Sequence, residues 1–330
     1  MNLKTTYLGL QLEHPVMAGA SPLGADMDAV RRLEDAGAAA IVLPSLFEEQ
    51  ITREETGTLY DLAGHADTFA EATSYFPRVD EMALGPESYL AQLQRVKAAV
   101  KVPVIASLNG ITNSGWLDYA VKMQDAGADA IELNIYYLAT NPLETADLVE
   151  KRTLEIVRTV KSSVKIPVAV KLSPFFSSLA HFTKVLEGAG ADAVVLFNRF
   201  YQPDLDIENL EVTPALQLSS SSTLRMRLRW LAILWSHVNV PMAVTGGVHT
   251  AEDAVKATMA GATGIQMVSA LLKHGPERLT QVKDGLKAWM EEHEYESLEQ
   301  MRGSMSLMKC PNPQAFERAN YMRVLQGWKA

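Results

Sequence analysis

The chain has 330 residues, of which 48% are hydrophobic and 21% are charged, and its formal net charge is −9 at pH 7. It can therefore bury a large core, and its acidity argues against nucleic acid or an anionic membrane surface as the main partner. Its only cysteine, Cys310, excludes an intrachain disulfide and an iron–sulfur ligand set within this chain. The N-terminus lacks an apolar signal segment, and no apolar run reaches the ~18 residues that span a bilayer, so we expect a cytoplasmic protein without membrane association.

Apolar strands alternate with helical patterns along the chain. Four strands follow a helix that ends in Ala-Gly-Ala, where glycine suits the left-handed position after a helix C-terminus. With their turns they span residues 36–43, 126–135, 189–197 and 260–268. Four others are entered through a proline, at 15–18, 102–108, 166–172 and 240–245. The spacing of apolar residues predicts helices over 26–36, 88–100 and 145–164.

Continuous apolar strands of this kind are typical of parallel strands buried on both faces. Eight repeats predict an α/β fold, a (β/α)8 TIM barrel, with residues 1–330 as a single domain. A doubly wound sheet is the alternative, but no GxGxxG motif follows the first strand. Long spacings place insertions after strands 2 and 6, at about 47–85 and 198–222, as candidate lids, and a C-terminal extension starts at about 291.

Polar residues and glycines at the ends of these strands form the candidate site, because barrel enzymes carry their active sites there. They are Ser21, Ser45, Asn109, Asn134, Lys171, Asn198, Gly246, Gly247 and Ser269. Lys171 stands out, since it ends the apolar run PVAVKL, where an inward-pointing ammonium group is costly to desolvate. A polar or anionic ligand would explain it, and a lysine that reaches solvent is the alternative.

The stretch 240–271 has the features of a phosphate site. The pair Gly246-Gly247 lies between a strand and a helical stretch that opens near Thr250, and a second strand ends at Ser269. Glycines without a Cβ let an anion approach the backbone, and a helix start adds positive partial charge. An ordinary tight turn is the alternative.

Other charged residues are expected to play smaller roles. Arg225, Arg227 and Arg229 alternate along a predicted helix, and an acidic run begins at Glu48, so we expect all of these to be solvated. An arginine of this helix that reaches a substrate carboxylate is the alternative. Arg78 and Arg199, on the two insertions, are candidates to bind a substrate carboxylate. The seven histidines show no metal-binding spacing, and no metal site is expected.

Five segments, in order, resemble the motifs of the dihydroorotate dehydrogenases, FMN-containing (β/α)8 barrels of pyrimidine biosynthesis. The segments are GLQLEHPVMAGASPLGAD, IELNIYY, PVAVKLSPFF, VVLFNRF and VTGGVHTAEDAVKATMAGATGIQMVSAL, and the match spans roughly residues 3–275. The resemblance implies an FMN site. Its residues would be Ala20 and Ser21 along the flavin, Asn134 and Lys171 at its ring, Ser45 and Asn109 nearby, and Gly246, Gly247, Val268 and Ser269 at its phosphate. Lys171 would stabilise negative charge on the reduced ring.

The substrate side departs from the family pattern. Family members carry a cysteine or a serine as base in the loop after strand 4, whereas Tyr137 holds that position here, next to Tyr136. Pro44 replaces a lysine that usually ends strand 2. We expect the substrate to contact Asn134, Asn198, Arg199 and Arg78. The flavin half of the pattern is thus kept, and the orotate half is largely rewritten.

Tyrosine chemistry decides which reactions suit this loop. A phenol with a pKa of about 10 needs a shift of about 3 units to remove a proton from carbon near pH 7, whereas donating a proton needs no shift. We expect an FMN-dependent oxidoreductase that acts on CH–CH bonds, with Tyr137, Tyr136 and Lys171 as catalytic residues. Its reaction would be oxidation of the dihydroorotate type or reduction of a small activated alkene. Tyrosines that only pack over the flavin are the alternative.

Two functions of other classes stay open. One is a flavin-free aldolase or synthase that uses Lys171 as a Schiff base. The other is a non-catalytic barrel subunit of a redox complex. The expected partners are a small-molecule substrate and an electron-transfer protein, and the resemblance implies a homodimer.

Overall fold

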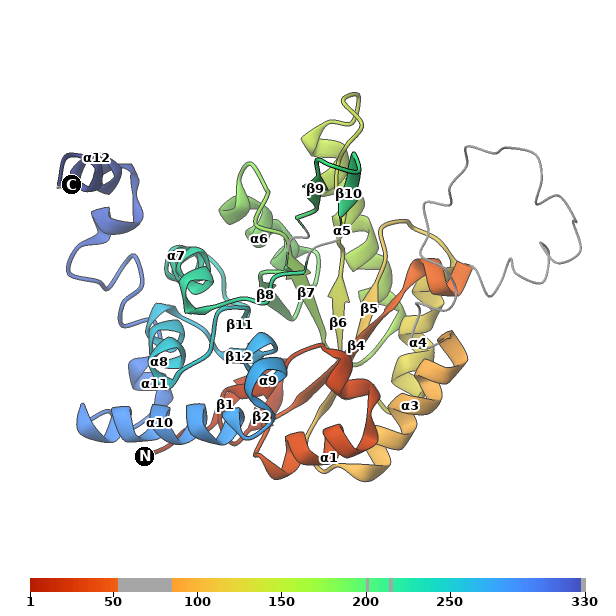
Figure 1. Ribbon diagram of the computed structural model, residues 1–330, viewed down its shortest axis with the longest axis horizontal. Coiled ribbons are helices and arrows are strands. Elements are labelled where there is room, and N and C mark those ends of the chain that lie inside the picture. The colour runs from red at the N-terminus through yellow and green to blue at the C-terminus, as the bar shows by residue number, and fades with distance from the viewer. Residues whose placement is uncertain (53–84, 200–201, 214–215, 328–330) are drawn as a thin grey trace, which may run out of the picture.

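The computed structural model describes residues 1–52, 85–199, 202–213 and 216–327. Eight parallel strands close into a barrel in the order β11-β12-β3-β4-β5-β6-β7-β8, with helices around the outside (Figure 1). Each strand pairs with the next barrel strand along the chain, and the last pairs with the first. The predicted (β/α)8 barrel is confirmed.

The barrel strands are short and buried. They are β3 (Val16–Ala18), β4 (Ile41–Phe47), β5 (Val104–Asn109), β6 (Ala130–Asn134), β7 (Val168–Leu172), β8 (Ala193–Leu196), β11 (Met242–Thr245) and β12 (Gly264–Met267). Every residue of β5 to β8 is buried, as expected for strands covered on both faces. The predicted end of the last strand at Ser269 is wrong, because β12 ends at Met267 and Ser269 begins a helix.

Helices follow the strands, as the spacing of apolar residues predicts. They are α1 (Met27–Asp35), α3 (Pro86–Ala99), α4 (Asp118–Asp125), α5 (Ala146–Ser163), α6 (Leu179–Gly188), α7 (Leu224–Leu234), α8 (Ala251–Ala260), α9 (Ser269–His274), α10 (Arg278–Glu292), α11 (Leu298–Met301) and α12 (Arg318–Gly327). The predicted helix start near Thr250 is confirmed, since this residue and Asp253 form a capping box at the start of α8. Short 3-10 turns lie at Pro22–Ala25, Gly115–Leu117, Ser221–Thr223 and Pro313–Phe316.

The N-terminal ends of the strands are held by aspartates that recur in the βα repeat. Asp129 and Asp192 each follow an Ala-Gly-Ala turn, and each accepts the first backbone N–H of the neighbouring strand, at 2.6 and 2.7 Å. They pair with lysines of the helices that lead into those neighbouring strands, Lys97 of α3 at 2.6 Å and Lys161 of α5 at 2.5 Å. These contacts stabilise the end of the barrel opposite to the candidate site.

A hairpin at the N-terminus of the chain closes the end of the barrel that is opposite to the candidate site. It consists of β1 (Thr5–Tyr7) and β2 (Leu10–Leu12), and its residues Tyr7, Leu8 and Leu12 are buried against the inner side chains of the barrel strands. Burial, and then the negative charge of Glu132 on β6, raise the pKa of Tyr7 well above its usual value. Tyr7 therefore lies in the barrel interior, within electrostatic reach of Glu132.

His14, between this hairpin and β3, is expected to make stability depend on pH. Its Nδ1 accepts the Val16 N–H at 3.2 Å, and burial together with the charge of Lys283 lowers its pKa from 6.5 to about 4. As the pH falls from 6.5 to 4, the unfolded chain takes up a proton that the folded protein does not. The free energy of unfolding should fall by roughly 3 kcal/mol over this window.

Urea unfolding between pH 4 and pH 7 would test this effect. His14→Asn keeps an acceptor near the Nδ1 position and removes the titration, so its stability should vary less with pH. The exposed His181 provides the control, since His181→Asn should leave the pH dependence of the parent protein unchanged. An equally steep dependence in His14→Asn would contradict the prediction.

The predicted insertions and extension are described in part. The insertion after β4 is described only up to Thr52 and from Gly85 onward, so most of the predicted segment 47–85 lies outside the described residues. The insertion after β8 forms a hairpin of β9 (Asp204–Asp206) and β10 (Glu211–Thr213), drawn toward the top of Figure 1. The extension includes α11 and α12, and α12 stands apart from the barrel (Figure 1).

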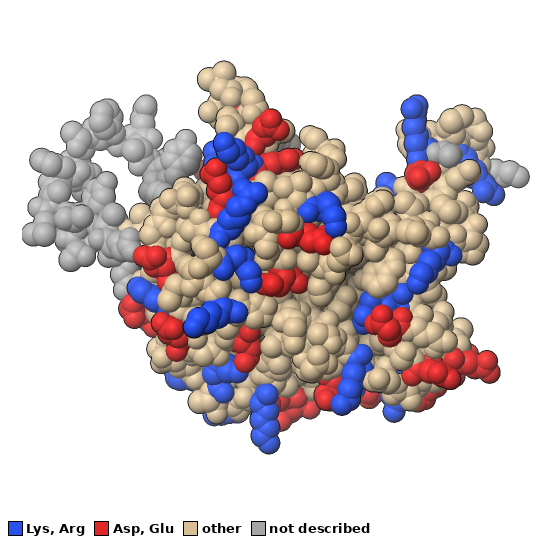
Figure 2. Space-filling model, turned by 180° about the vertical axis from the view of Figure 1, so that it is seen from behind, with Lys and Arg blue, Asp and Glu red and all other residues tan. Residues whose placement is uncertain are grey.

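The surface carries both signs of charge. On the face seen in Figure 2, Lys and Arg side chains are interspersed with Asp and Glu over the barrel helices. Among the residues that the structure describes, none of the helices has the length and apolar character required to cross a membrane.

Candidate active site

A buried charged network lies inside the barrel below the mouth. The Lys171 Nζ donates to Glu132 Oε1 at 2.9 Å, and Gln266 Nε2 donates to Glu132 Oε2 at 2.5 Å. The lysine is 8% exposed and the other two residues are 1% exposed. Lys171 therefore does not reach solvent, and its ammonium group has a carboxylate partner that the sequence analysis missed. One of its three N–H donors is used by Glu132.

Asn109 and Asn134 lie at the same level of the barrel as Lys171. In the strand register, Asn134 stands opposite both Asn109 on β5 and Lys171 on β7. The Asn198 amide donates to Asn134 Oδ1 at 2.9 Å, which joins the ends of β6 and β8 across β7. Three of the predicted residues, Asn134, Lys171 and Asn198, are thus brought together, and Asn109 is buried beside them.

Side chains at the ends of the neighbouring strands β12, β3, β4 and β5 are also buried or hydrogen-bonded. Ser45 on β4 shares a hydrogen bond of 2.7 Å with the Ser107 hydroxyl on β5. Ser21 is buried just after β3, next to the half-buried Ala20. A Cβ added to Gly19 would lie 2.7 Å from Val268 Cγ2, so the ends of β3 and β12 approach closely here. Ala20 and Val268, predicted to line the same cofactor, therefore sit on adjacent strand ends.

Gly246 and Gly247 turn the chain sharply after β11. Their φ angles are +82° and +93°, values that L-residues with side chains rarely adopt. A Cβ at Gly247 would lie 2.6 Å from the Leu224 backbone nitrogen, and a Cβ at Gly246 would lie 2.9 Å from an Arg227 nitrogen. The packing of α7 therefore also requires glycine here, in addition to the predicted approach of an anion.

Ser219, at the end of the β8 insertion, completes the wall of this site. Its Oγ accepts the Gly247 N–H at 3.2 Å, and its own N–H donates to Ser269 Oγ at 3.1 Å. Lys273 Nζ donates to its carbonyl at 3.1 Å. Burial, and then the nearby ammonium group of Lys273, lower the pKa of His249, whose Nε2 lies 3.4 Å from Ser219 Oγ. The insertion is therefore attached to both halves of the predicted phosphate site.

Arg227 corrects an expectation. Arg225 and Arg229 are exposed as expected, but Arg227 is 7% exposed and donates to the carbonyls of Thr245, Thr223 and Phe197. Burial, and then the charge of Arg199, lower the pKa of Arg227 to about 10. Arg199 itself is exposed near the mouth, and Arg78 lies outside the described residues.

Tyr137 is held from the outside of the barrel by Glu144, which lies just before α5, and by Arg152 on α5. Its hydroxyl donates to Glu144, Arg152 also pairs with Glu144, and the Arg152 guanidinium lies 4.7 Å from the centre of the Tyr137 ring. The hydrogen bond from Tyr137, and then the contact with Arg152, lower the pKa of Glu144. Tyr136 is half-buried beside it. The loop after β6 is thus fixed by a contact that the sequence did not indicate.

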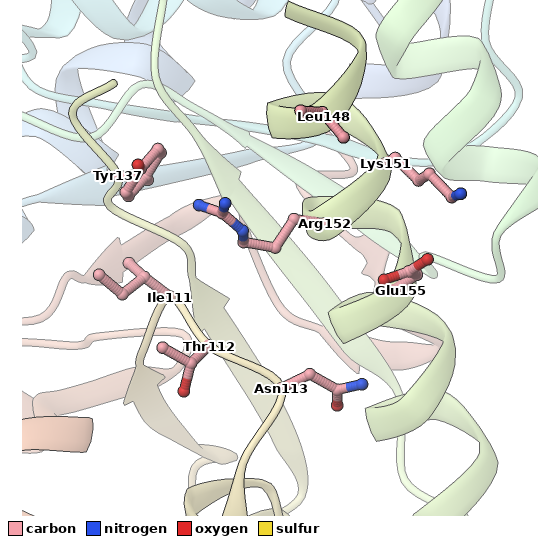
Figure 3. A pocket seen from close by; sticks show the side chains of 8 residues that line it. All are labelled: Ile111, Thr112, Asn113, Tyr137, Leu148, Lys151, Arg152 and Glu155. Carbon is pink, nitrogen blue, oxygen red and sulfur yellow. The ribbon is translucent and has the colours of Figure 1, made fainter. Parts of the chain in front are cut away.

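A cleft of about 610 Å³ opens next to Tyr137. It is lined by residues 111–113 after β5, by Tyr137, and by α5 side chains that include Leu148, Lys151, Arg152 and Glu155. Figure 3 shows Arg152 reaching from α5 toward Tyr137 across it. Glu48 is 8% exposed and accepts the N–H of the lining residue Ile111 at 2.8 Å. The expectation that Glu48 is solvated is therefore wrong.

Comparison with known proteins decides the family. The family model described as Dihydroorotate dehydrogenase matches residues 69–290. The chain belongs to the dihydroorotate dehydrogenase family. Members of this family are oxidoreductases that act on CH–CH bonds, which agrees with the predicted enzyme class.

Several relatives align with this chain along nearly their full length. A protein of Thermoplasma volcanium is 29% identical over 312 residues, covering 92% of this chain and 98% of the relative. One of Methanocaldococcus jannaschii is 27% identical over 306 residues, covering 88% and 94%. One of Alkaliphilus metalliredigens is 25% identical over 317 residues, covering 92% and 99%. All three are named dihydroorotate dehydrogenase B (NAD(+)), catalytic subunit.

The described part of this dihydroorotate dehydrogenase family member has groups that suit a flavin phosphate and ring. Backbone turns with positive φ and the cationic Lys273 suit an anion at Gly246-Gly247. The buried ammonium of Lys171 suits a polar ring with an anionic reduced form. Within the described ranges, no group of three or more His, Cys, Asp or Glu residues could hold a metal ion.

Proposed function

We propose that this protein is an FMN-dependent oxidoreductase that acts on a CH–CH bond of a small carbonyl substrate of the dihydroorotate type. The observation that carries the proposal is the ammonium group of Lys171, buried at the end of β7 beside the Asn134–Asn198 amide pair, in a chain of this family. When bound, FMN supplies the hydride-transfer chemistry of the reaction. The protein supplies binding, orientation and charge.

Each part of the site has a distinct task in this proposal. The Gly246-Gly247 turn, Ser269 and Lys273 hold the phosphate by backbone and side-chain donors. Lys171 places positive charge at the ring. The amide groups of Asn134 and Asn198 have further donors and acceptors with which to orient polar atoms of the substrate.

The ion pair argues against the flavin-free alternative. A Schiff base requires a neutral amine with a free lone pair. Lys171 instead donates to the buried carboxylate of Glu132 at 2.9 Å, so its Nζ is engaged in an ion pair. An aldolase or synthase mechanism through Lys171 is therefore disfavoured.

The Tyr137 contact supports a second candidate reaction, the reduction of a small activated alkene. The Tyr137 hydroxyl donates to Glu144, and this hydrogen bond lowers the pKa of the Glu144 carboxyl group, so Tyr137 acts as a hydrogen-bond donor in this arrangement. A neutral phenol can protonate one carbon of a substrate during reduction.

The absorption spectrum of the purified protein, recorded without oxygen before and after addition of dihydroorotate, tests both reactions. A flavin band that dihydroorotate bleaches supports the dihydroorotate-type oxidation. A flavin band that dihydroorotate leaves unchanged, but that an α,β-unsaturated acid restores after photoreduction, supports alkene reduction. Failure to show a flavin band even after FMN is supplied would contradict the proposed function.

Replacement of Tyr137 tests its role. If Tyr137 is the proton donor, Tyr137→Phe should lower kcat by about 10²- to 10⁴-fold with little change in FMN content. Glu144→Gln should have a smaller effect, because it keeps a hydrogen-bond acceptor. The exposed Tyr321 on α12 provides the matched control, since Tyr321→Phe should retain full turnover. Full turnover in Tyr137→Phe would show that this tyrosine only packs in the site.

The names of the relatives support a further part of the proposal. Those proteins are named catalytic subunits, which indicates that they work with another subunit. We propose that this chain likewise passes electrons to a protein partner, in the cytoplasm. Co-purification from a native source, followed by turnover assays with and without the partner fraction, would test this.

A further inference from the structure

The Glu132 carboxylate is the most deeply placed charge of the site. Both of its oxygens are used, one by Lys171 at 2.9 Å and the other by Gln266 at 2.5 Å. These groups come from β6, β7 and β12, so the network ties together strands from distant parts of the chain. Glu132 lies two residues before Asn134 on β6 and therefore on the same face of the strand, one layer below the mouth.

A buried ion pair of this kind is a poor source of stability. The desolvation of two charges offsets most of their attraction, and apolar side chains of similar volume often serve as well. Barrel-interior positions nearer the hairpin include the apolar residues Val42, Ile105 and Ala169. The charges at this level therefore have an explanation in function rather than in packing.

The ion pair of Lys171 and Glu132 also determines the electrostatic potential at the mouth of the barrel. An isolated ammonium group would present a full positive charge, but a carboxylate at 2.9 Å compensates much of it. The hydrogen bond from Gln266 withdraws charge from that carboxylate and so weakens the compensation. The three side chains together set the effective charge of Lys171.

We propose that Glu132 and Gln266 are positioning residues that tune the reduction potential of the flavin through Lys171. The inference rests on the proposed function, because it requires FMN at the mouth of the barrel. Glu132 orients the ammonium group and lowers its effective charge, and Gln266 limits that effect by holding the second carboxylate oxygen.

Two substitutions should shift the potential in opposite directions. Glu132→Gln keeps the shape and an acceptor for Lys171 but removes the negative charge. The side-chain amide of Gln266 can rotate by half a turn so that its Oε1 accepts from the new amide at position 132. This oxygen has no hydrogen-bond partner among the described residues. The uncompensated ammonium should then favour the reduced, anionic flavin at least tenfold, a rise of about 30 mV for a two-electron couple. Gln266→Met leaves a more negative carboxylate against Lys171, and the potential should fall.

The measurement is photoreduction of each FMN-loaded protein with a reference dye, and Asp192→Asn serves as a matched control. Asp192 also pairs with a lysine, at 2.5 Å, but at the opposite end of the barrel, so its replacement should leave the potential unchanged. Opposite shifts in the two test variants support the proposal. An unchanged or lower potential in Glu132→Gln overturns it, because a merely structural role would not raise the potential.

Other outcomes are also decisive. If Glu132→Gln does not fold, Gln266→Met decides alone, and an unchanged or higher potential in that variant overturns the proposal. If the unmodified protein binds no flavin, the proposed function fails. If it binds flavin and neither variant moves the potential, only the present inference fails.

Discussion

Lys171→Met is expected to lower turnover by about 10²- to 10³-fold, because it removes the positive charge that the proposed function places at the flavin ring. Methionine keeps most of the length and volume of lysine, so the barrel interior should not collapse. FMN should still bind through its phosphate, since the Gly246-Gly247 turn is untouched. Turnover with the substrate identified by the spectral test, normalised to bound flavin, is the measurement.

The same variant should be less stable, for a reason that can be separated from catalysis. Without its partner, the Glu132 carboxylate is left buried at 1% exposure with an uncompensated charge, which costs about 3–5 kcal/mol. The double variant Glu132→Gln, Lys171→Met removes both charges and should regain most of this stability in urea unfolding. It should not regain turnover. Recovery of turnover in the double variant would mean that Lys171 acts only in folding.

The sequence was sufficient to predict the barrel and most of the residues at its mouth. Strands of parallel barrels are buried on both faces, so a polar residue at the end of an apolar run stands out, as Lys171 and Asn134 do. Because parallel strand ends meet at one edge, such residues were expected to gather there. The amide pair of Asn134 and Asn198 and the register of Asn134 with Lys171 confirm that expectation.

The sequence did not reveal that Glu132 and Gln266 form a hydrogen-bonded network with Lys171, because these residues are distant from one another along the chain. Gln266 and Glu132 are 134 residues apart, and no local pattern links them. Glu132 itself carried a usable signal, since it interrupts the apolar run AIELN as clearly as Lys171 interrupts its own strand. Applying the desolvation argument to both charges would have predicted the ion pair.

Two residues that were expected to be solvated are buried: Arg227, from the helix periodicity, and Glu48, from the charge pattern. Both rules assume that a charged side chain prefers water, whereas each of these finds unpaired backbone groups to bind. Arg227 donates to the carbonyls around the Gly246 turn, and Glu48 accepts N–H groups of the loop after β5. Loops at the ends of barrel strands leave such backbone groups exposed to side chains, and only the three-dimensional arrangement shows which residue reaches them.

Gly247→Ala is expected to lower FMN affinity by about 10- to 100-fold, which corresponds to the loss of one or two hydrogen bonds to a charged phosphate. The new Cβ would lie 2.6 Å from the Leu224 backbone nitrogen, and the φ of +93° is strained for alanine, so the turn must shift. Such a shift moves the N–H of residue 247 away from Ser219 and from the site of the phosphate.

Comparison of FMN with riboflavin identifies the cause of that loss. If the turn binds the phosphate, Gly247→Ala should weaken FMN binding and leave riboflavin binding nearly unchanged, because riboflavin has no phosphate. Gly188→Ala is the matched control, since Gly188 ends helix α6 with open space around it and alanine should be tolerated or slightly stabilising there. Equal losses for both ligands would show that the glycine pair serves only the packing against α7. That outcome would place the phosphate elsewhere and remove the main support for the site at Gly246-Gly247.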